Sequence, residues 1–300
     1  MKLNILFSSV VVQVNVVSAK IYEFFKYQYA SQIYESDDTE KYDIRIVECE
    51  DKIEFFEQAK RNSAIEERFL TVTWFSNKDE IVFCVNNASQ GVLYQFSLYL
   101  SHRMYALITK LNVYSLHGSC VCTPHKQDGV VLFGGSGCGK SSIALLLTHY
   151  YDYKIVTDDL LIMEKSTQKI KIEKNMRSIG ISDSDFNCKY QNLHAFVEKA
   201  PFERKLRLNY YKYNPTAYIS TCHPKQIFIL QERADIPTIR QISFQTALMK
   251  LLQLHSYYGQ DVADLLEIFE PLLKNCETYS IKTAFDIEKT ANCLMQQVLK

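Results

Sequence analysis

A glycine-rich segment that ends in lysine and serine is the part of this sequence whose residue types could most directly do chemistry. Its pattern is G-x-x-x-x-G-K-S, and the segment with its following serine comprises Gly134, Gly135, Ser136, Gly137, Cys138, Gly139, Lys140, Ser141 and Ser142. Glycines let successive backbone N–H groups turn inward around an anion, and the N-terminus of a following helix adds positive potential. The lysine can reach the outer phosphates of a nucleotide, and the serine hydroxyl can bind Mg²⁺. The segment therefore predicts a binding loop for a nucleoside triphosphate.

The residues on either side of the loop predict the elements that must position it. Residues 129–133 form a short apolar run typical of a strand, and residues 142–148 have the apolar character of a buried helix. A strand, a glycine loop and a helix in this order are the structural context that such a phosphate loop requires.

A pair of adjacent carboxylates follows the next apolar run. Residues 154–157 predict a strand, and Asp158 and Asp159 come directly after it. One such carboxylate can hold Mg²⁺ and the other can accept the proton of an attacking hydroxyl. Their repulsion tends to raise one pKa, which favours the base role. We expect Asp158 to be the general base and Asp159 to bind Mg²⁺ together with Ser141; a turn with two solvated acids is the alternative.

The loop and the early position of the acidic pair resemble the HPr kinase/phosphorylase family and its phosphoenolpyruvate carboxykinase-type relatives. Residues 116–121, which include His117, are similar to the His-Gly strand that precedes the loop in that family. Residues 176–181, which include Arg177, are similar to its Arg-Gly-Leu-Gly segment. The resemblance implies an α/β fold: a P-loop nucleotide-binding domain of the HPr kinase C-terminal type, with a smaller mixed α/β N-terminal domain.

The same resemblance implies a kinase that uses ATP and Mg²⁺ and transfers the γ-phosphoryl group to a hydroxyl. Lys140 would neutralise the phosphates, His117 would orient Asp158 or touch the transferred group, and Arg177 would clamp an anion. A structural histidine and a surface arginine are the alternatives. Relatives of this kind suggest a serine or threonine of a peptide or protein as acceptor, for example in a modified peptide natural product, and assembly into a homo-oligomer. A small-molecule kinase and an ATPase switch without an acceptor remain open.

Two positions depart from that family. HPr kinases carry an acidic residue after the loop serine, where this chain has Ser142, and a metal-binding glutamate, where it has Asn175. These departures argue against a second metal site and against the reverse phosphorolysis. The sequence therefore predicts a divergent relative with a different acceptor.

Composition limits the other classes of function. The chain has 300 residues, 47% of them hydrophobic, with 34 basic and 34 acidic side chains and a formal net charge of zero. This balance, without a dense basic tract, argues against nucleic acid as the main partner. No apolar run reaches the length that spans a bilayer. Nine cysteines without paired C-x-x-C spacing argue against a zinc site or a disulfide framework, and we expect a cytoplasmic protein.

The apolar pattern divides the chain near residue 90. In the N-terminal domain, 1–90, strand-like runs lie at 5–17, 43–49, 69–75 and 81–85, and a hairpin turn at 76–79 joins the last two. The first run alternates apolar and polar residues, which favours a half-buried strand over a secretory signal. We expect this domain to help shape the acceptor pocket.

The kinase domain, 91–300, is predicted to begin with a long helix and to end in a strand and three helices. Their expected positions are 92–111 for the first helix, 226–230 for the strand, and 244–257, 262–275 and 287–299 for the last helices.

Overall fold

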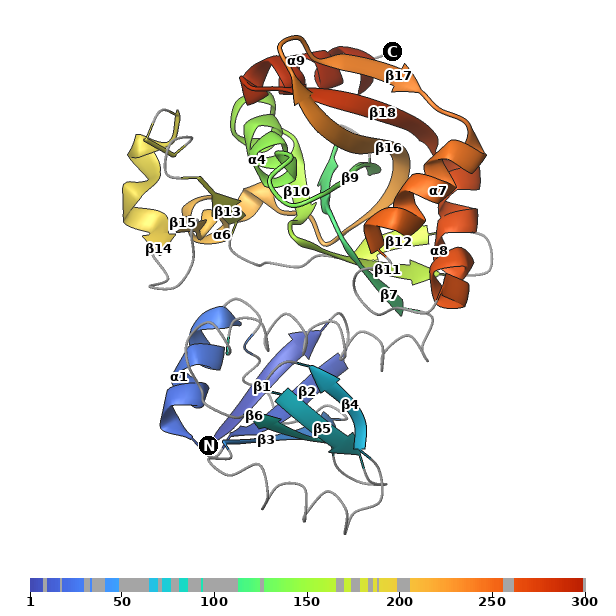
Figure 1. Cartoon of the computed structure of the whole chain (residues 1–300). Coiled ribbons are helices and arrows are strands. Elements are labelled where there is room, and N and C mark those ends of the chain that lie inside the picture. The colour runs from blue at the N-terminus through green and yellow to red at the C-terminus, as the bar shows by residue number, and fades with distance from the viewer. Residues whose placement is uncertain are drawn as a thin grey trace. The chain divides into compact units, whose positions relative to one another are not determined.

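The protein forms two compact units in a computed structural model, and each unit is described by itself (Figure 1). The structure describes residues 1–7, 10–16, 18–29, 33, 41–48, 65–69, 72–76, 81–85, 93, 113–124, 127–165, 170–173, 179–182, 186–187, 189–198, 206–255 and 262–298. The units are Met1–Leu107 and Ile108–Lys300. This division lies further along the chain than residue 90. The helix expected at 92–111 falls, apart from Leu93, outside the described residues, so the domain assignment stays a prediction.

In its described part, the first unit is a six-stranded mixed sheet with one helix packed on it. The strand order is β1-β2-β3-β6-β5-β4, and helix α1 (Ala19–Gln28) contacts β2. Ile21 and Phe25 of α1 and Val12 and Val14 of β2 are all buried and belong to the core of this unit. The strands are β1 (Lys2–Phe7), β2 (Val10–Val16), β3 (Lys41–Glu48), β4 (Ile65–Phe69), β5 (Val72–Ser76) and β6 (Ile81–Val85).

Two strand predictions for this unit were wrong. Residues 5–17 do not form one strand but belong to a hairpin, in which Phe7 pairs with Val10. Residues 69–75 likewise span two strands, and Phe69 pairs with Val72. In both cases apolar residues stand on both sides of a short reversal, so periodicity alone does not show where one strand ends. The predicted pairing of the strand at 81–85 with its predecessor is confirmed by the antiparallel β5–β6 register.

The second unit is built around a curled, mixed sheet of nine strands among the described residues (Figure 1). The order along the sheet is β10-β8-β9-β16-β12-β11-β7, with β18 beside β16 and β17 beside β18. The strands are β7 (Val113–His117), β8 (Ser119–Cys122), β9 (Asp128–Gly134), β10 (Lys154–Thr157), β11 (Leu160–Lys165), β12 (Ile170–Glu173), β16 (Thr221–Ala234), β17 (Thr238–Gln241) and β18 (Glu277–Ala284). A three-stranded sheet and short helices lie beside it: β13 (Ile179–Ile181), β14 (Val197–Glu198), β15 (Leu206–Leu208), η3 (Gln191–Phe196), α6 (Tyr210–Tyr213) and η4 (Pro215–Ala217).

Two pairs of helices cover the two faces of this sheet. Helix α4 (Lys140–Tyr151) packs with α9 (Ile287–Val298) over one apolar cluster, and α7 (Phe244–His255) packs with α8 (Val262–Asn275) over another. Strand β9 lies between the two clusters and is buried on both faces, which explains its uninterrupted apolar run. Each fully buried leucine or isoleucine in these clusters contributes about 1.5–3 kcal/mol to stability. The phosphate-loop candidate therefore starts from a rigid strand.

The predicted C-terminal elements are largely confirmed. Helix α8 has the predicted bounds, α7 and α9 begin where predicted, and the strand expected at 226–230 is the centre of the longer β16. None of the helices in the described part of the chain combines the length and the apolar character that crossing a bilayer requires.

Candidate active site

The glycine loop connects the carboxyl end of β9 to the first turn of α4. Three glycines have positive φ, which side chains disfavour: +153° at Gly134, +81° at Gly137 and +100° at Gly139. A Cβ at Gly134 would also lie 2.6 Å from Sγ of Cys138 and 2.9 Å from the carbonyl oxygen of Leu230. Glycine is therefore required at 134 by both backbone conformation and space.

Lys140 is the first residue of α4, and its side chain turns back into the loop. Its ammonium group donates to the carbonyl oxygens of Gly134 at 2.7 Å and Gly135 at 2.9 Å, and the residue is 6% exposed. A buried cation at the N-terminus of a helix adds its charge to the positive end of the helix dipole. This combination creates a local positive potential that suits an anion such as a phosphate.

The carboxylate pair lies where the antiparallel pairing between two chain segments, β7–β8 and β10–β11, is interrupted. Strand β7 pairs with β11 up to His117 and Leu160, while β8 pairs with β10 from Cys120 and Thr157 onward. The residues left between the two ladders are Gly118, Ser119, Asp158 and Asp159.

Asp158 is the most buried charged side chain of this interruption, at 1% exposure. The Ser119 hydroxyl donates to its Oδ1, whereas its buried Oδ2 has no hydrogen-bond partner of normal geometry among the described residues. Burial, and then the neighbouring Asp159, raises the pKa of Asp158; Ser119, Ser141 and Lys140 oppose this rise. A carboxylate with a raised pKa and one oxygen without a donor is suited to accept a proton.

Asp159 and His117 form the more exposed side of the same interruption. Asp159 has φ +69°, a left-handed conformation that Asp tolerates better than most residues. Nδ1 of His117 lies 2.9 Å from the backbone oxygen of Asp159 and 3.4 Å from Oδ1 of Asp159. Burial and the charge of Lys140 lower the pKa of His117, and the nearby aspartates only partly offset this. We infer a neutral imidazole at pH 7 that holds the turn carrying both carboxylates.

The structure therefore brings five predicted site residues together, and a sixth, Arg177, lies outside the described residues. Ser141 and Ser142 are half-buried in the first turn of α4, and Ser136 is exposed in the loop. Arg177 lies outside the described residues, so its predicted clamp role stays a prediction. The residues brought together are His117, Lys140, Ser141, Asp158 and Asp159.

Sequence reasoning missed two residues of this site, Ser119 and His255. Ser119 follows the His-Gly pair directly, and its position as the lone hydroxyl in an otherwise apolar strand could have indicated a functional residue. His255 lies at the end of α7, is 1% exposed and packs edge-on against Phe133 at 5.3 Å between ring centroids. Burial lowers the pKa of His255 to about 4, and its interactions with His117 and Lys140 place it behind the site. No local pattern indicated this, because α7 lies far along the chain.

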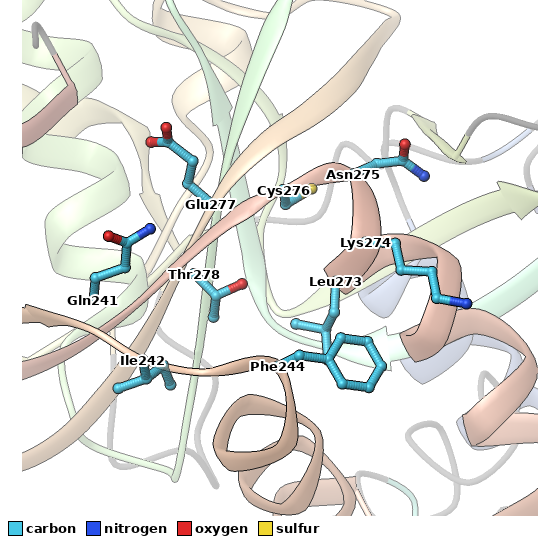
Figure 2. A pocket seen from close by; sticks show the side chains of 9 residues that line it. All are labelled: Gln241, Ile242, Phe244, Leu273, Lys274, Asn275, Cys276, Glu277 and Thr278. Carbon is cyan, nitrogen blue, oxygen red and sulfur yellow. The ribbon is translucent and has the colours of Figure 1, made fainter.

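A surface hollow of about 350 Å³ lies elsewhere on the second unit (Figure 2). It is lined in part by Phe244 at the start of α7, Lys274 near the end of α8 and Thr278 at the start of β18. Because β9 and β18 both run parallel to β16, the hollow lies at the amino ends of these strands and the glycine loop at their carboxyl ends. The Lys274 ammonium is paired with Glu270. Because it lies at the opposite ends of these strands, the hollow is separate from the candidate active site.

Comparisons with known proteins give a weak likeness to solved structures and no match in sequence. No protein-family model matches the chain, and no curated protein matches it. Among solved structures, the chain is similar to the Hpr(Ser) kinase/phosphatase from Coxiella burnetii, with 13% sequence identity and a TM-score of 0.29. The match covers 43% of this chain and 72% of that chain. A likeness this weak does not establish a family.

Proposed function

We propose that the second unit is a kinase that transfers the γ-phosphoryl group of ATP to a serine or threonine hydroxyl of a peptide or protein. The observation that carries this proposal is Asp158, a buried carboxylate beside a lysine-containing glycine loop, whose Oδ2 has no hydrogen-bond partner of normal geometry in the part of the chain that the structure describes. A loop that suits phosphate and a base that suits a hydroxyl proton are the two parts that phosphoryl transfer needs.

The fold that we propose for this unit is the P-loop domain of the HPr kinase C-terminal type. Support comes from the chain order: β9, the glycine loop and α4 are followed at once by β10, which ends at the carboxylate pair. Further support comes from His117 at the end of β7, whose Nδ1 lies 2.9 Å from the backbone oxygen of Asp159. Cytoplasmic location, a homo-oligomer and the anion clamp at Arg177 are parts of the same proposal.

The residues of the site also fit a bound Mg²⁺. Mg²⁺ in such sites uses one or two carboxylates together with substrate phosphates and water. The described residues contain no cluster of three or more His, Cys, Asp or Glu side chains arranged for a metal. Ser141 and the partly exposed Asp159 would hold the ion. The bound ion would supply charge neutralisation on the phosphates.

The chemical step assigns one task to each residue. Lys140 and the loop amides hold the triphosphate, and the Ser119 hydroxyl and His117 keep the carboxylate turn in place. The acceptor oxygen forms its bond to the γ-phosphorus while its proton passes to Oδ2 of Asp158. The bond between the γ-phosphorus and the bridging oxygen breaks, and ADP leaves with that electron pair.

Transfer of label from γ-labelled ATP tests the proposed function. The full chain would be incubated with Mg²⁺, ATP and a pool of peptides that contain serine and threonine, beside a pool of small hydroxyl compounds. Labelled peptide is the expected result. Label only on small compounds would establish a small-molecule kinase instead, and free phosphate without any labelled acceptor would favour an ATPase switch.

Replacing Lys140 by Ala should raise the Kd for ATP about 10–100-fold, because a hydrogen bond from a charged donor contributes about 1.5–3 kcal/mol. Calorimetric titration with ATP and Mg²⁺ measures the change, and a thermal melt verifies that the variant is folded. Lys212→Ala is the matched control, since Lys212 is an exposed lysine of α6. Equal affinities of the Lys140 variant and the unmodified chain would exclude the loop as the triphosphate site.

Replacing Ser119 by Ala should move the acid limb of the kcat–pH profile to higher pH. The Ser119 hydrogen bond lowers the pKa of Asp158, so its loss lets that pKa rise further. A base must be deprotonated to act, so turnover at a pH on the limb falls. Thr148→Ala is the control, because that buried hydroxyl donates within α4, to the carbonyl oxygen of Ala144 at 2.9 Å. An unchanged limb in the Ser119 variant would contradict this role.

A further inference from the structure

The strands beside the glycine loop give a bound nucleotide a direction. Strands β9, β16 and β18 run parallel, so their carboxyl ends meet at one edge of the sheet. Strand β10 is also parallel to β9, because both pair antiparallel with β8, and its carboxyl end leads into Asp158. The loop therefore lies between the carboxylate pair on one side and the ends of β16 and β18 on the other. A nucleotide whose outermost phosphate faces Asp158 would then extend its nucleoside toward the ends of β16 and β18.

An exposed aromatic side chain lies at that end of the sheet. Phe285 directly follows β18 and is 66% exposed. The guanidinium of Arg233, near the end of β16, lies over its ring at 5.9 Å from the centroid. The same guanidinium reaches the loop, where it donates to the carbonyl oxygen of Gly137 at 3.5 Å. One arginine thus links the aromatic ring to the phosphate loop.

The turn that carries Phe285 is fixed against the loop. A Cβ at Gly139 would lie 2.5 Å from Cδ1 of Ile287, so the start of α9 packs directly on the loop. The hydroxyl of Thr290 accepts from the backbone N–H of Ala284 at 2.7 Å, which closes the turn between β18 and α9. Figure 1 shows α9 beside α4, the helix that directly follows the loop. Phe285 is therefore presented by a structured turn next to the phosphate site.

We propose that Phe285 is the base-binding residue of this site, stacking on the nucleobase of the triphosphate, and that Arg233 positions its ring. The proposal rests on the proposed nucleotide-binding function and deepens it. Aromatic faces stack on any base, and a purine offers the larger area. The apolar ring otherwise remains in water, so covering it with a base is favourable.

Binding of ATP and of inorganic tripolyphosphate, each with Mg²⁺, separates the base from the phosphates. Titration of the full-length Phe285→Ala protein should show ATP affinity reduced about 5–100-fold, the effect of losing one base–aromatic stack. Tripolyphosphate affinity should stay within about twofold, because that ligand has no base. Phe285→Leu keeps apolar bulk without an aromatic face and should recover only part of the loss. Met249→Ala, which removes an exposed apolar side chain of α7, is the matched control and should bind both ligands normally.

Each other outcome has a definite meaning. Normal ATP affinity in the Phe285→Ala protein, with the unmodified chain binding both ligands, would overturn the base subsite and leave the proposed function intact. Equal weakening of ATP and tripolyphosphate would show that Phe285 supports the loop, which also overturns the subsite. An unmodified chain that binds neither ligand would overturn the proposed function and the subsite with it.

Discussion

Replacing Asp158 by Asn is expected to lower the turnover of phosphoryl transfer about 10²–10⁴-fold and to leave ATP affinity nearly unchanged. The reason is the division of tasks that we propose for the site: the loop and Lys140 would hold the phosphates, whereas Oδ2 of Asp158 would receive the proton of the acceptor. Asn keeps the shape and the acceptor oxygen for Ser119 but cannot take that proton. Steady-state transfer kinetics and ATP titration on the same preparation measure the two quantities.

The pH profile gives this prediction a second readout. Because burial raises the pKa of Asp158, its acid limb should lie above the range of an ordinary aspartate, and turnover should rise with pH through that limb. The Asn variant should lack the limb. Asp152→Asn is the control, since Asp152 is exposed at the C-cap of α4 with φ +59°, a conformation that Asn also accepts. An Asp158→Asn protein with normal turnover would show that another group takes the proton.

Replacing Gly134 by Ala is expected to destabilise the protein by about 2–4 kcal/mol and to abolish measurable ATP binding. The added Cβ meets a backbone oxygen, that of Leu230, at 2.9 Å, and the φ of +153° is unfavourable for alanine. The backbone cannot move away as a flexible side chain could, so β9, β16 or the loop must shift. Denaturant unfolding and titration with ATP and Mg²⁺ test both effects.

The chain offers a matched control one residue away. At Gly135 an added Cβ would have no atom within 4 Å, and its φ is not in the left-handed region. Gly135→Ala should therefore change stability by less than about 0.5 kcal/mol, as surface substitutions usually do. If both variants were equally stable, the close approach of the loop to β16 would be contradicted.

The sequence by itself determined the parts of the site that depend on neighbours along the chain. Positive φ at Gly137 and Gly139 requires glycine locally, and the helix follows at once, so the loop and α4 were predictable. Asp158 and Asp159 were predictable as a pair for the same reason, because they directly follow a strand. The roles of these residues remain predictions that the experiments above test.

Element ends and one strand were harder to predict. Strand β18 was not predicted, because the run is short and partly polar, although Tyr279, Ile281 and Thr283 are buried and the intervening Ser280 and Lys282 are less so. The apolar pattern predicts single strands at 5–17 and 69–75, where the structure has antiparallel strand pairs, because a reversal flanked by apolar residues leaves the periodicity almost unchanged.

Only the tertiary structure decided which distant residues complete the site. Ser119 donates to Asp158 across 39 residues of sequence, and it does so because the ladder between two pairs of strands is interrupted at both positions. His255 ends α7 and Phe285 follows β18, and no pattern in the residues around them indicates that they lie near the loop. Their proximity results from parallel strand order and helix packing, which bring residues together through long-range pairing. Local patterns record backbone conformation, whereas contacts across a sheet exist only once the whole chain has folded.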